Sequence, residues 1–361
     1  MALGRHVLAD VSGHGFGHLA QVAPVLNALR HRLPDLRLTV RCELAADLVR
    51  SRVAGPVQVV KATVDMGLAM HSALDVDART SVRRYAEFHT GWTSRVAAAA
   101  ANMATLRPDL VLADVPYLSL EAAARLSVPA VALCSLNWAD IYERYAREAP
   151  EQARITAEIR SAYRRATHFL QPCPSMPMVD LPQRRPVGPI AALGRNRRSE
   201  VEARVGLVPG DRLVLVGLGG IETRLPVETW PMAPGTHWVV PAAWGVCRAD
   251  VVVIEALGMP FLDVLASSDV LLTKTGYGSF VEAACNGVRV LHVPRPDWPE
   301  EPYLASWLGA HGVSRPVDRS VLDSGELQAP LEALLESPAR QPPAPTGAEE
   351  AADVLAPLLA R

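Results

Sequence analysis

The chain has 361 residues, which at about 150 residues per domain indicates two domains that can each bury a large core. Hydrophobic residues make up 49% and aromatic residues only 5%, so the apolar content is mostly aliphatic, which excludes a disordered chain and suits helices packed on sheets. Lysine and arginine total 36 against 38 acidic residues, and the resulting net charge of -2 lacks the basic excess that nucleic-acid binding needs.

Strands and helices alternate through the first half of the chain. A short apolar run predicts a strand at 6–12, and apolar residues at helical spacing predict a helix over 19–33, which Pro34 ends. Further elements are predicted at 38–42 (strand), 110–113 (strand), 118–126 (helix) and 130–134 (strand). This alternation is typical of a parallel sheet with helices on both faces.

The composition changes at 171–189, QPCPSMPMVDLPQRRPVGP, where proline is too dense for a continuous helix or an inner strand. We therefore place the junction between two domains there. Beyond it, elements are predicted at 213–216, 251–254, 270–272 and 288–293 (strands) and at 279–286 and 349–359 (helices).

The predicted organisation is an N-terminal domain over 1–180, a C-terminal domain over 181–345 and a terminal helix over 346–361. Both domains are expected to be α/β, each a doubly wound parallel sheet. Such domains bind ligands in the crevice at the carboxyl ends of their strands, so functional residues should lie just after strands.

The five cysteines are scattered and form no CxxC pair, which argues against a disulfide framework and a structural zinc site. The N-terminus lacks a basic segment followed by a long apolar stretch, and no apolar run approaches the roughly 18 residues of a membrane span. We expect a cytoplasmic protein with no transmembrane segment, no nucleic-acid partner and no resident metal or required cofactor. Binding of Mg²⁺ together with a nucleotide stays open.

The loop SGHGFGH at 12–18 joins the first predicted strand to the first predicted helix. Its three glycines allow close approach of a ligand, and the helix N-terminus offers N–H groups to an anion or a hydroxyl. A dinucleotide fingerprint would need glycine at position 18, so NAD is disfavoured. An imidazole ordinarily titrates near neutral pH, so His14 and His18 are candidate general bases, with plain capping or local hydrogen bonding as the alternative.

Asp114 directly follows the predicted strand 110–113, so it should lie at the same sheet edge as His18. A carboxylate there can hold an imidazole in one tautomer and stabilise its cation. An Asx turn before Pro116, or a helix cap, explains Asp114 equally well from the residues alone.

The strongest pattern is KTGYGSFVE at 274–282, after a predicted strand. Ser279 is expected to cap a helix with Glu282 three residues later, which alone would be a capping box. Lys274, however, is one of only two lysines, and a diphosphate on the helix N-terminus would explain both this cation and the two glycines. The absence of GxxxxGK[ST] disfavours ATP hydrolysis.

Two weaker patterns follow other predicted strands. Gly217, Gly219 and Gly220 form a second glycine turn, a candidate opposite wall of the phosphate site. The acidic segment DWPEEP at 297–302 is braced by proline, and its carboxylates can accept hydrogen bonds from sugar hydroxyls. A solvated acidic loop is the alternative.

Together these residues resemble the GT-B superfamily of nucleotide-sugar glycosyltransferases, which includes the lipid-intermediate N-acetylglucosaminyltransferase of bacteria and the UDP-glycosyltransferases of plants. The chain most resembles the glycosyltransferase-like N-terminal domain of plant L-arabinokinases. The resemblance spans nearly the whole chain and rests on GHGFGH at 13–18, NWADIY at 137–142, KTGYGSFVEA at 274–283 and EEPYL at 300–304. We find no kinase phosphate loop, so kinase activity is not implied.

The resemblance implies the GT-B fold, with two Rossmann-like domains facing a shared cleft. It also implies an inverting transfer of a sugar from a UDP- or dTDP-sugar to an acceptor hydroxyl or amine, with His18 as base and Asp114 as its partner. The implied donor-binding residues are Gly219, Gly220, Lys274, Thr275, Gly276, Gly278, Ser279, Glu282, Glu300 and Glu301. The expected acceptor-binding residues are His14, Gly15, Phe16, Asn137 and Trp138.

Within that donor site, the resemblance assigns the ribose hydroxyls to Glu282 and the diphosphate to the turn that holds Gly278. Lys274 stands where plant enzymes have a phosphate-binding histidine. Glu300 and Glu301 stand where related enzymes carry an Asp-Gln pair that holds the sugar, so the sugar is not identified. The uracil or thymine base of the donor is expected to contact backbone groups near residues 259–262.

Two other functions stay open. GT-B proteins include sugar-nucleotide 2-epimerases, and the acidic pair at 300–301 suits that chemistry. A non-catalytic sugar-nucleotide-binding protein would keep the donor site and need no base. The sequence leaves open the oligomeric state and the acceptor, which is a small molecule, a glycan or a lipid-linked molecule. Asn137 and Trp138 could equally be packing residues beneath the cleft.

Overall fold

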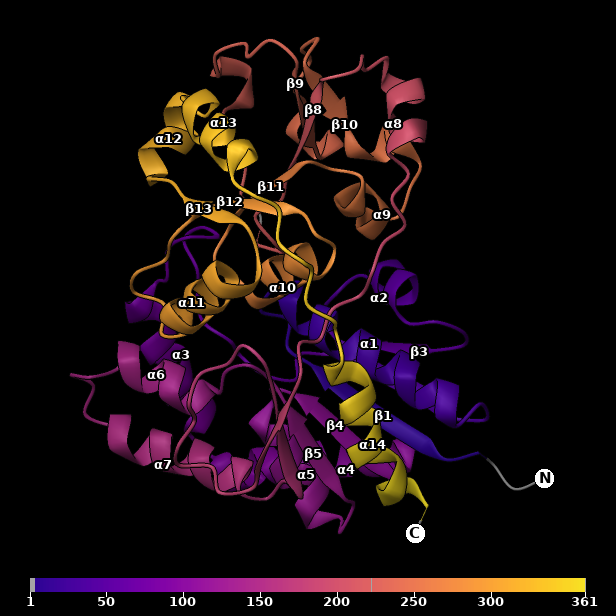
Figure 1. Ribbon diagram of the computed structural model, residues 1–361. Coiled ribbons are helices and arrows are strands. Elements are labelled where there is room, and N and C mark those ends of the chain that lie inside the picture. Colours follow the sequence, from indigo (N-terminus) through magenta and orange to yellow (C-terminus); the bar gives the residue numbers. More distant parts are fainter. Residues whose placement is uncertain (1–3, 222, 361) are drawn as a thin grey trace.

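The computed structural model describes residues 4–221 and 223–360 and has two domains, each built on a parallel sheet (Figure 1). One domain lies above the other in this view. The first sheet has seven strands in the order β3-β2-β1-β4-β5-β6-β7, and the second has six in the order β10-β9-β8-β11-β12-β13. The predicted α/β class with two doubly wound domains is confirmed.

The first sheet and the helices around it form the lower domain in Figure 1. Its strands are β1 (His6–Val11), β2 (Arg37–Cys42), β3 (Gln58–Lys61), β4 (Leu110–Asp114), β5 (Ala130–Leu133), β6 (His168–Pro172) and β7 (Arg184–Val187). Its helices are α1 (Gly17–Arg32), α2 (Ala46–Arg52), α3 (Ala78–His89), α4 (Trp92–Leu106), α5 (Tyr117–Arg125), α6 (Trp138–Tyr145) and α7 (Gln152–Tyr163).

The second sheet and its helices form the upper domain. Its strands are β8 (Arg212–Val216), β9 (Thr236–Val240), β10 (Val251–Val253), β11 (Val270–Lys274), β12 (Arg289–Val293) and β13 (Ser314–Pro316). Its α-helices are α8 (Arg198–Val205), α9 (Phe261–Ala266), α10 (Tyr277–Cys285), α11 (Glu301–His311), α12 (Arg319–Ser324) and α13 (Gln328–Glu336). Three short 3-10 helices are η1 (Val227–Thr229), η2 (Ala242–Trp244) and η3 (Ile254–Leu257).

Burial along the strands explains why their sequences are continuous apolar runs. All six residues of β1 are buried, because helices cover both faces of the sheet at this inner strand. Val7 and Ala9 belong to one apolar cluster and Leu8 to another, on opposite faces. The second sheet is covered in the same way, with Leu213 and Val214 in separate clusters.

The proline-dense segment 171–189 ends the first domain. Its first residues complete β6, and β7 then adds the edge strand of the first sheet. An edge is the place in a sheet that tolerates proline, because one side of the strand needs no partner. The first sheet therefore extends to residue 187, beyond the predicted domain limit at residue 180, and the chain enters the second domain before α8.

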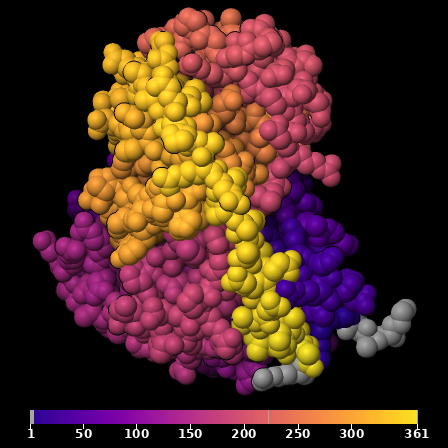
Figure 2. Space-filling model, viewed as in Figure 1, coloured from indigo at the N-terminus to yellow at the C-terminus, as the bar shows by residue number. Residues whose placement is uncertain are grey.

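The last helix, α14 (Gly347–Leu359), returns to the first domain and packs on α1. Figure 2 shows this C-terminal segment running down from the upper domain along the surface of the lower one. Ala351, Ala352 and Leu355 are fully buried in the same cluster as the β1 and α1 side chains. The predicted terminal helix thus ties the end of the chain to the domain at its beginning.

Several further contacts join the two domains. The Tyr145 hydroxyl donates to the Asp297 carbonyl (3.0 Å), and the Ala73 N–H donates to the Thr223 hydroxyl (2.9 Å). Arg319 pairs with Asp75 at 2.7 Å. Among residues 4–221 and 223–360, no helix is both long and apolar enough to cross a membrane.

The position of α14 predicts a stability effect. Leu355→Ala should lower the free energy of unfolding by about 2–5 kcal/mol, because it leaves a cavity between α14 and α1. Denaturant unfolding followed by circular dichroism measures this loss. Asp353→Ala, on the exposed side of α14 and paired there with Arg32, is the control and should cost about 1 kcal/mol or less. Equal losses in the two variants would contradict the assigned packing.

Candidate functional site

The candidate site lies where the carboxyl ends of the two sheets face each other. Helix α1 begins after β1, and α10 begins after β11, so their N-termini meet at the domain junction. A Cβ added to Gly278 would lie 3.3 Å from Gly17 Cα and 3.2 Å from Ala20 Cβ. A side chain at 278 would require its neighbours on α1 to move by a few tenths of an ångström.

His18 and Asp114 form a buried pair on the N-terminal side of this junction. His18 is the second residue of α1, Asp114 is the last residue of β4, and His18 Nδ1 lies 2.8 Å from Asp114 Oδ1. The carboxylate makes Nδ1 the donor, which leaves Nε2 as the nitrogen that can accept a proton. The predicted neighbourhood of the two residues is confirmed, and the Asx-turn alternative is not needed.

The charge around His18 favours its protonated form. Burial, the largest single cause, lowers the pKa of His18, but the charge and hydrogen bond of Asp114 and the charges of Asp65 and Glu300 together outweigh it, so the net pKa lies above its ordinary value. Cys134 Sγ lies 3.9 Å from Nδ1, and Asp114 Oδ2 is buried without a hydrogen-bond partner. An imidazole in this setting can take up a proton and hold it as a stabilised cation.

Asp65 is a site residue that the sequence analysis missed. Ser12 Oγ donates to Asp65 Oδ1 (3.0 Å), and Trp138 Nε1 donates to Oδ2 (2.8 Å). Burial raises the pKa of Asp65 to about 6, although His18 acts in the opposite direction. Its position in the loop after β3, at the carboxyl edge of the first sheet, was the signal that could have found it.

The five predicted acceptor-binding residues fall into two groups. Trp138 and Asn137 are buried, and the Asn137 side chain accepts from the Asp140 N–H (2.9 Å) as the N-cap of α6. His14, Gly15 and Phe16 belong to the loop 12–18 and are more exposed. His14 packs edge-on against Trp138 and stacks on Trp298 of the other domain. The exposed Phe16 approaches Gly220.

His14 is a poorer candidate base than His18. Burial, followed by the positive charges of His18, Arg295 and Lys274, lowers the pKa of His14 to about 3. Its imidazole is therefore neutral at physiological pH and a weak proton acceptor. In this structure His14 acts as an aromatic surface between the two domains.

The turn at 274–279 faces the junction from the C-terminal domain, as predicted. Gly276 is the N-cap of α10, so Ser279 lies in the first turn, and the Glu282 carboxylate does not close a capping box. The expectation that Ser279 caps the helix is wrong, because α10 begins two residues earlier than predicted. The early start leaves the N–H groups of Tyr277, Gly278 and Ser279 without carbonyl partners in the helix, as an anion site requires.

Lys274 and its neighbours complete this turn. Lys274 Nζ would lie 3.8 Å from a Cβ placed on Gly219, so the second glycine turn does face the first. Burial and the charge of Arg295 lower the pKa of Lys274 to about 7, against the opposite effect of Glu300 and Glu301. The buried hydroxyl of Thr275 has no hydrogen-bond partner.

Glu282 is engaged across the junction. Its carboxylate pairs at 2.5 Å with Arg52, the last residue of α2 in the N-terminal domain, and both side chains are largely buried. Burial raises the pKa of Glu282, and Arg52 opposes that rise. The guanidinium of Arg52 also lies over the Phe261 ring, 5.8 Å from its centroid. The sequence analysis did not identify Arg52, which no motif marks.

The acidic segment 297–302 is not a solvated loop at its centre. Glu300 is only 3% exposed, with Oε2 accepting from Trp298 Nε1 (3.2 Å) and Oε1 left without a partner. Glu301 begins α11, and its carboxylate accepts from the backbone N–H of Arg295 (2.9 Å). Of the two acidic residues, Glu300 therefore has an oxygen available for a ligand.

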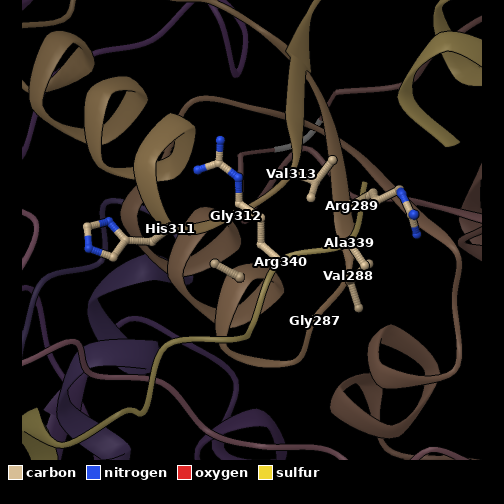
Figure 3. Close-up of a pocket in the computed structure, with 9 residues that line it drawn as sticks. Gly287, Val288, Arg289, His311, Gly312, Val313, Ala339 and Arg340 are labelled. Carbon is tan, nitrogen blue, oxygen red and sulfur yellow. The ribbon is translucent and has the colours of Figure 1, made fainter. Parts of the chain in front are cut away.

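A separate pocket, shown in Figure 3, lies away from these residues. It is formed around the start of β12, the end of α11 and the segment 339–340. Its lining includes Arg289, His311 and Arg340, and Arg340 donates to the Gly309 carbonyl (2.7 Å). Because it opens at the amino ends of β12 and β13, it does not contribute to the site at their carboxyl ends.

Comparison with solved structures identifies the fold class. The glycotransferase of kitacinnamycin matches with a TM-score of 0.61 at 20% identity over 99% of each chain, and spinosyn forosaminyltransferase SpnP with 0.60 at 16% over 100% of each. The chain therefore has the GT-B fold, as predicted. A putative UDP-N-acetylglucosamine 2-epimerase from Listeria monocytogenes is also similar (TM-score 0.54, 15% identity, 98% of this chain and 95% of that one).

A curated protein adds a more particular likeness. The chain is 26% identical over 319 residues to L-arabinokinase of Arabidopsis thaliana, which covers 82% of this chain and 29% of that protein. The chain thus spans under a third of that relative's length. No protein-family model matches.

The geometry predicts how His18 titrates. In Asp114→Asn the carboxylate that stabilises the imidazolium is lost while the burial remains, so the pKa of His18 should fall. Histidine-resolved NMR titration of the folded protein measures the shift. Asp353→Asn, far from the pair, should leave the His18 titration unchanged. An unchanged or higher pKa in Asp114→Asn would show that Asp114 does not control His18.

Proposed function

We propose that this chain is an inverting glycosyltransferase that moves a sugar from a UDP- or dTDP-sugar to an acceptor hydroxyl or amine. The observation that carries the proposal is the placement of the His18–Asp114 pair opposite the N-terminus of α10 and Lys274. The proposed general base and the proposed anion site thus lie on opposite sides of one junction. The reaction needs no resident metal or cofactor, since the nucleotide sugar is a substrate.

The N-terminal side supplies the base. His18 Nε2 accepts the proton of the acceptor as its oxygen or nitrogen attacks the anomeric carbon, and Asp114 stabilises the imidazolium that results. Asp65 holds the buried Trp138, whose ring lies beside both histidines.

The C-terminal side receives the leaving group. As the new bond forms, the bond from the anomeric carbon to the diphosphate oxygen breaks, and negative charge accumulates on the nucleoside diphosphate. The N–H groups at the start of α10, the Ser279 hydroxyl and Lys274 can stabilise that charge. Glu300 Oε1, buried without a partner, can accept from a sugar hydroxyl.

Donor binding would change one contact of this structure. Glu282 is the proposed partner of the ribose hydroxyls, and here its carboxylate is paired with Arg52 of the other domain. The carboxylate has two oxygens, so it can accept from a ribose while keeping one bond to Arg52, or the pair can separate as the domains move. The segment Met259 to Leu262, proposed to contact the nucleobase, includes Phe261, which Arg52 already touches.

Replacement of His18 tests the chemistry. In an assay of UDP or dTDP release from nucleotide sugars with phenol, sugar and amine acceptors, His18→Ala should reduce acceptor-dependent turnover by about a hundredfold or more. Nucleotide affinity should be retained. His31→Ala, at the exposed far end of α1, is the matched control.

The other outcomes of this assay decide between functions. Wild-type rates in His18→Ala would exclude His18 as the base. An altered sugar nucleotide formed without any acceptor would favour the 2-epimerase function. Tight nucleotide binding with no turnover across the acceptors would favour a non-catalytic binding protein.

The lowered pKa of Lys274 predicts how donor binding depends on pH. The bound diphosphate stabilises the charged amine, so nucleotide binding at pH 8 should take up a proton, and affinity should weaken as the pH rises above about 7. Calorimetric titration with UDP and dTDP in two buffers of different ionisation enthalpy measures both effects. Lys274→Arg should remove the pH dependence, because arginine stays charged.

Lys61→Arg replaces the other lysine, which is exposed on β3, and should behave as the wild type. Lys274→Met should weaken binding at every pH. If Lys274→Met binds nucleotide as tightly as the wild type, Lys274 does not contact the diphosphate.

A further inference from the structure

Arg295 is a buried cation with donors that nothing in the described chain satisfies. It follows β12 by two residues and is 7% exposed. Its Nε and Nη2 atoms are buried without hydrogen-bond partners, and its guanidinium lies over the Trp298 ring, 4.4 Å from the centroid. A buried guanidinium with unused donors is costly, so its side chain fits a role in binding an anion.

The surroundings of Arg295 place it in the candidate site. It lowers the pKa of both Lys274 and His14, so the three groups lie within electrostatic reach of one another. The same segment carries Glu300, whose Oε1 atom also lacks a partner. Neither Glu300 nor Glu301 forms an ion pair with Arg295 among the residues described, and the Glu301 carboxylate takes the Arg295 backbone N–H instead.

Arg295 and Glu300 contact the same aromatic ring. The Arg295 guanidinium lies over the Trp298 ring, and Trp298 Nε1 donates to Glu300 Oε2 (3.2 Å). Tyr145 and Asp75 of the N-terminal domain also influence the pKa of Arg295, which burial lowers. Lys274, in contrast, lies next to Gly219 and Gly276, at the two glycine turns. Arg295 is therefore grouped with Glu300, the proposed sugar-binding residue.

We propose that Arg295 binds a carboxylate on the transferred sugar, so that the preferred donor is a nucleoside diphosphate hexuronate. This inference rests on the proposed function. One ligand would then satisfy both unpartnered groups: a sugar hydroxyl donates to Glu300 Oε1, and the sugar carboxylate accepts from Nε and Nη2 of Arg295. That edge of a guanidinium matches a carboxylate with two parallel hydrogen bonds. Entry of the sugar would displace local contacts such as His14 on Trp298.

The experiment compares donors that differ only at C6 of the sugar. Calorimetry measures the Kd of UDP, UDP-glucose and UDP-glucuronate for the wild-type protein, Arg295→Gln and Arg295→Lys. If the protein binds dTDP and not UDP, the corresponding dTDP compounds replace them. Arg315→Gln, exposed on β13 of the same domain, is the matched control.

The wild type should bind the hexuronate about tenfold or more tightly than the hexose, the range expected of a charge-assisted hydrogen bond. Arg295→Gln should remove that preference and leave the affinities for UDP and UDP-glucose nearly unchanged. Arg295→Lys should keep only part of it, because lysine cannot form the two parallel bonds. Arg315→Gln should behave as the wild type.

Three results would overturn the inference. Equal affinity of the wild type for the hexose and the hexuronate would show that Arg295 does not bind a sugar carboxylate. An equal loss of UDP and UDP-glucuronate affinity in Arg295→Gln would assign Arg295 to the diphosphate. If Arg295→Gln still preferred the hexuronate, another residue would be responsible for that preference. Failure to bind any nucleotide would instead overturn the proposed function, and unchanged UDP binding in the variants shows that they are folded.

Discussion

The close approach of α1 and α10 is the constraint on which the rest of the site depends. Both helices follow a strand of a parallel sheet, so both present free N–H groups at the carboxyl edge of their domain. Gly278 lets the two N-termini meet with little space between them. Any base carried by α1 therefore faces any anion held by α10, and the positions of His18 and Lys274 follow from this geometry.

The fold was predictable because the signals for it are local. Inner strands such as β1 are buried on both faces and have continuous apolar sequences, whereas the edge strand β7, inside the proline-dense segment, was not predicted. The His18–Asp114 contact was predictable in part, since both residues follow strands that proved to be neighbours, β1 and β4. Residues alone left an Asx turn equally open at Asp114, and only the pairing of the strands decided between them.

What escaped prediction are contacts between segments that are far apart in the sequence. Arg52 and Glu282 are 230 residues apart, and neither position carries a pattern that points to the other. Asp65 and Arg295 lie in loops and belong to no sequence motif. Both became site candidates only because the structure buries their charged side chains. The start of α10 was also misplaced: Ser279 and Glu282 match a capping box, but Gly276 is the N-cap and the Glu282 carboxylate pairs with Arg52 of the other domain.

The charges of the site are arranged by side. The N-terminal side carries Asp114 and Asp65, which favour the cationic form of His18, whereas the C-terminal side carries Lys274 and Arg295, which disfavour charge on each other. An anionic donor relieves the repulsion between those two cations, because each can then pair with negative charge. A neutral site with the same fold would gain much less from binding an anion. These two neighbouring cations, and not the fold, therefore argue that the proposed ligand of the C-terminal domain carries more than one negative group.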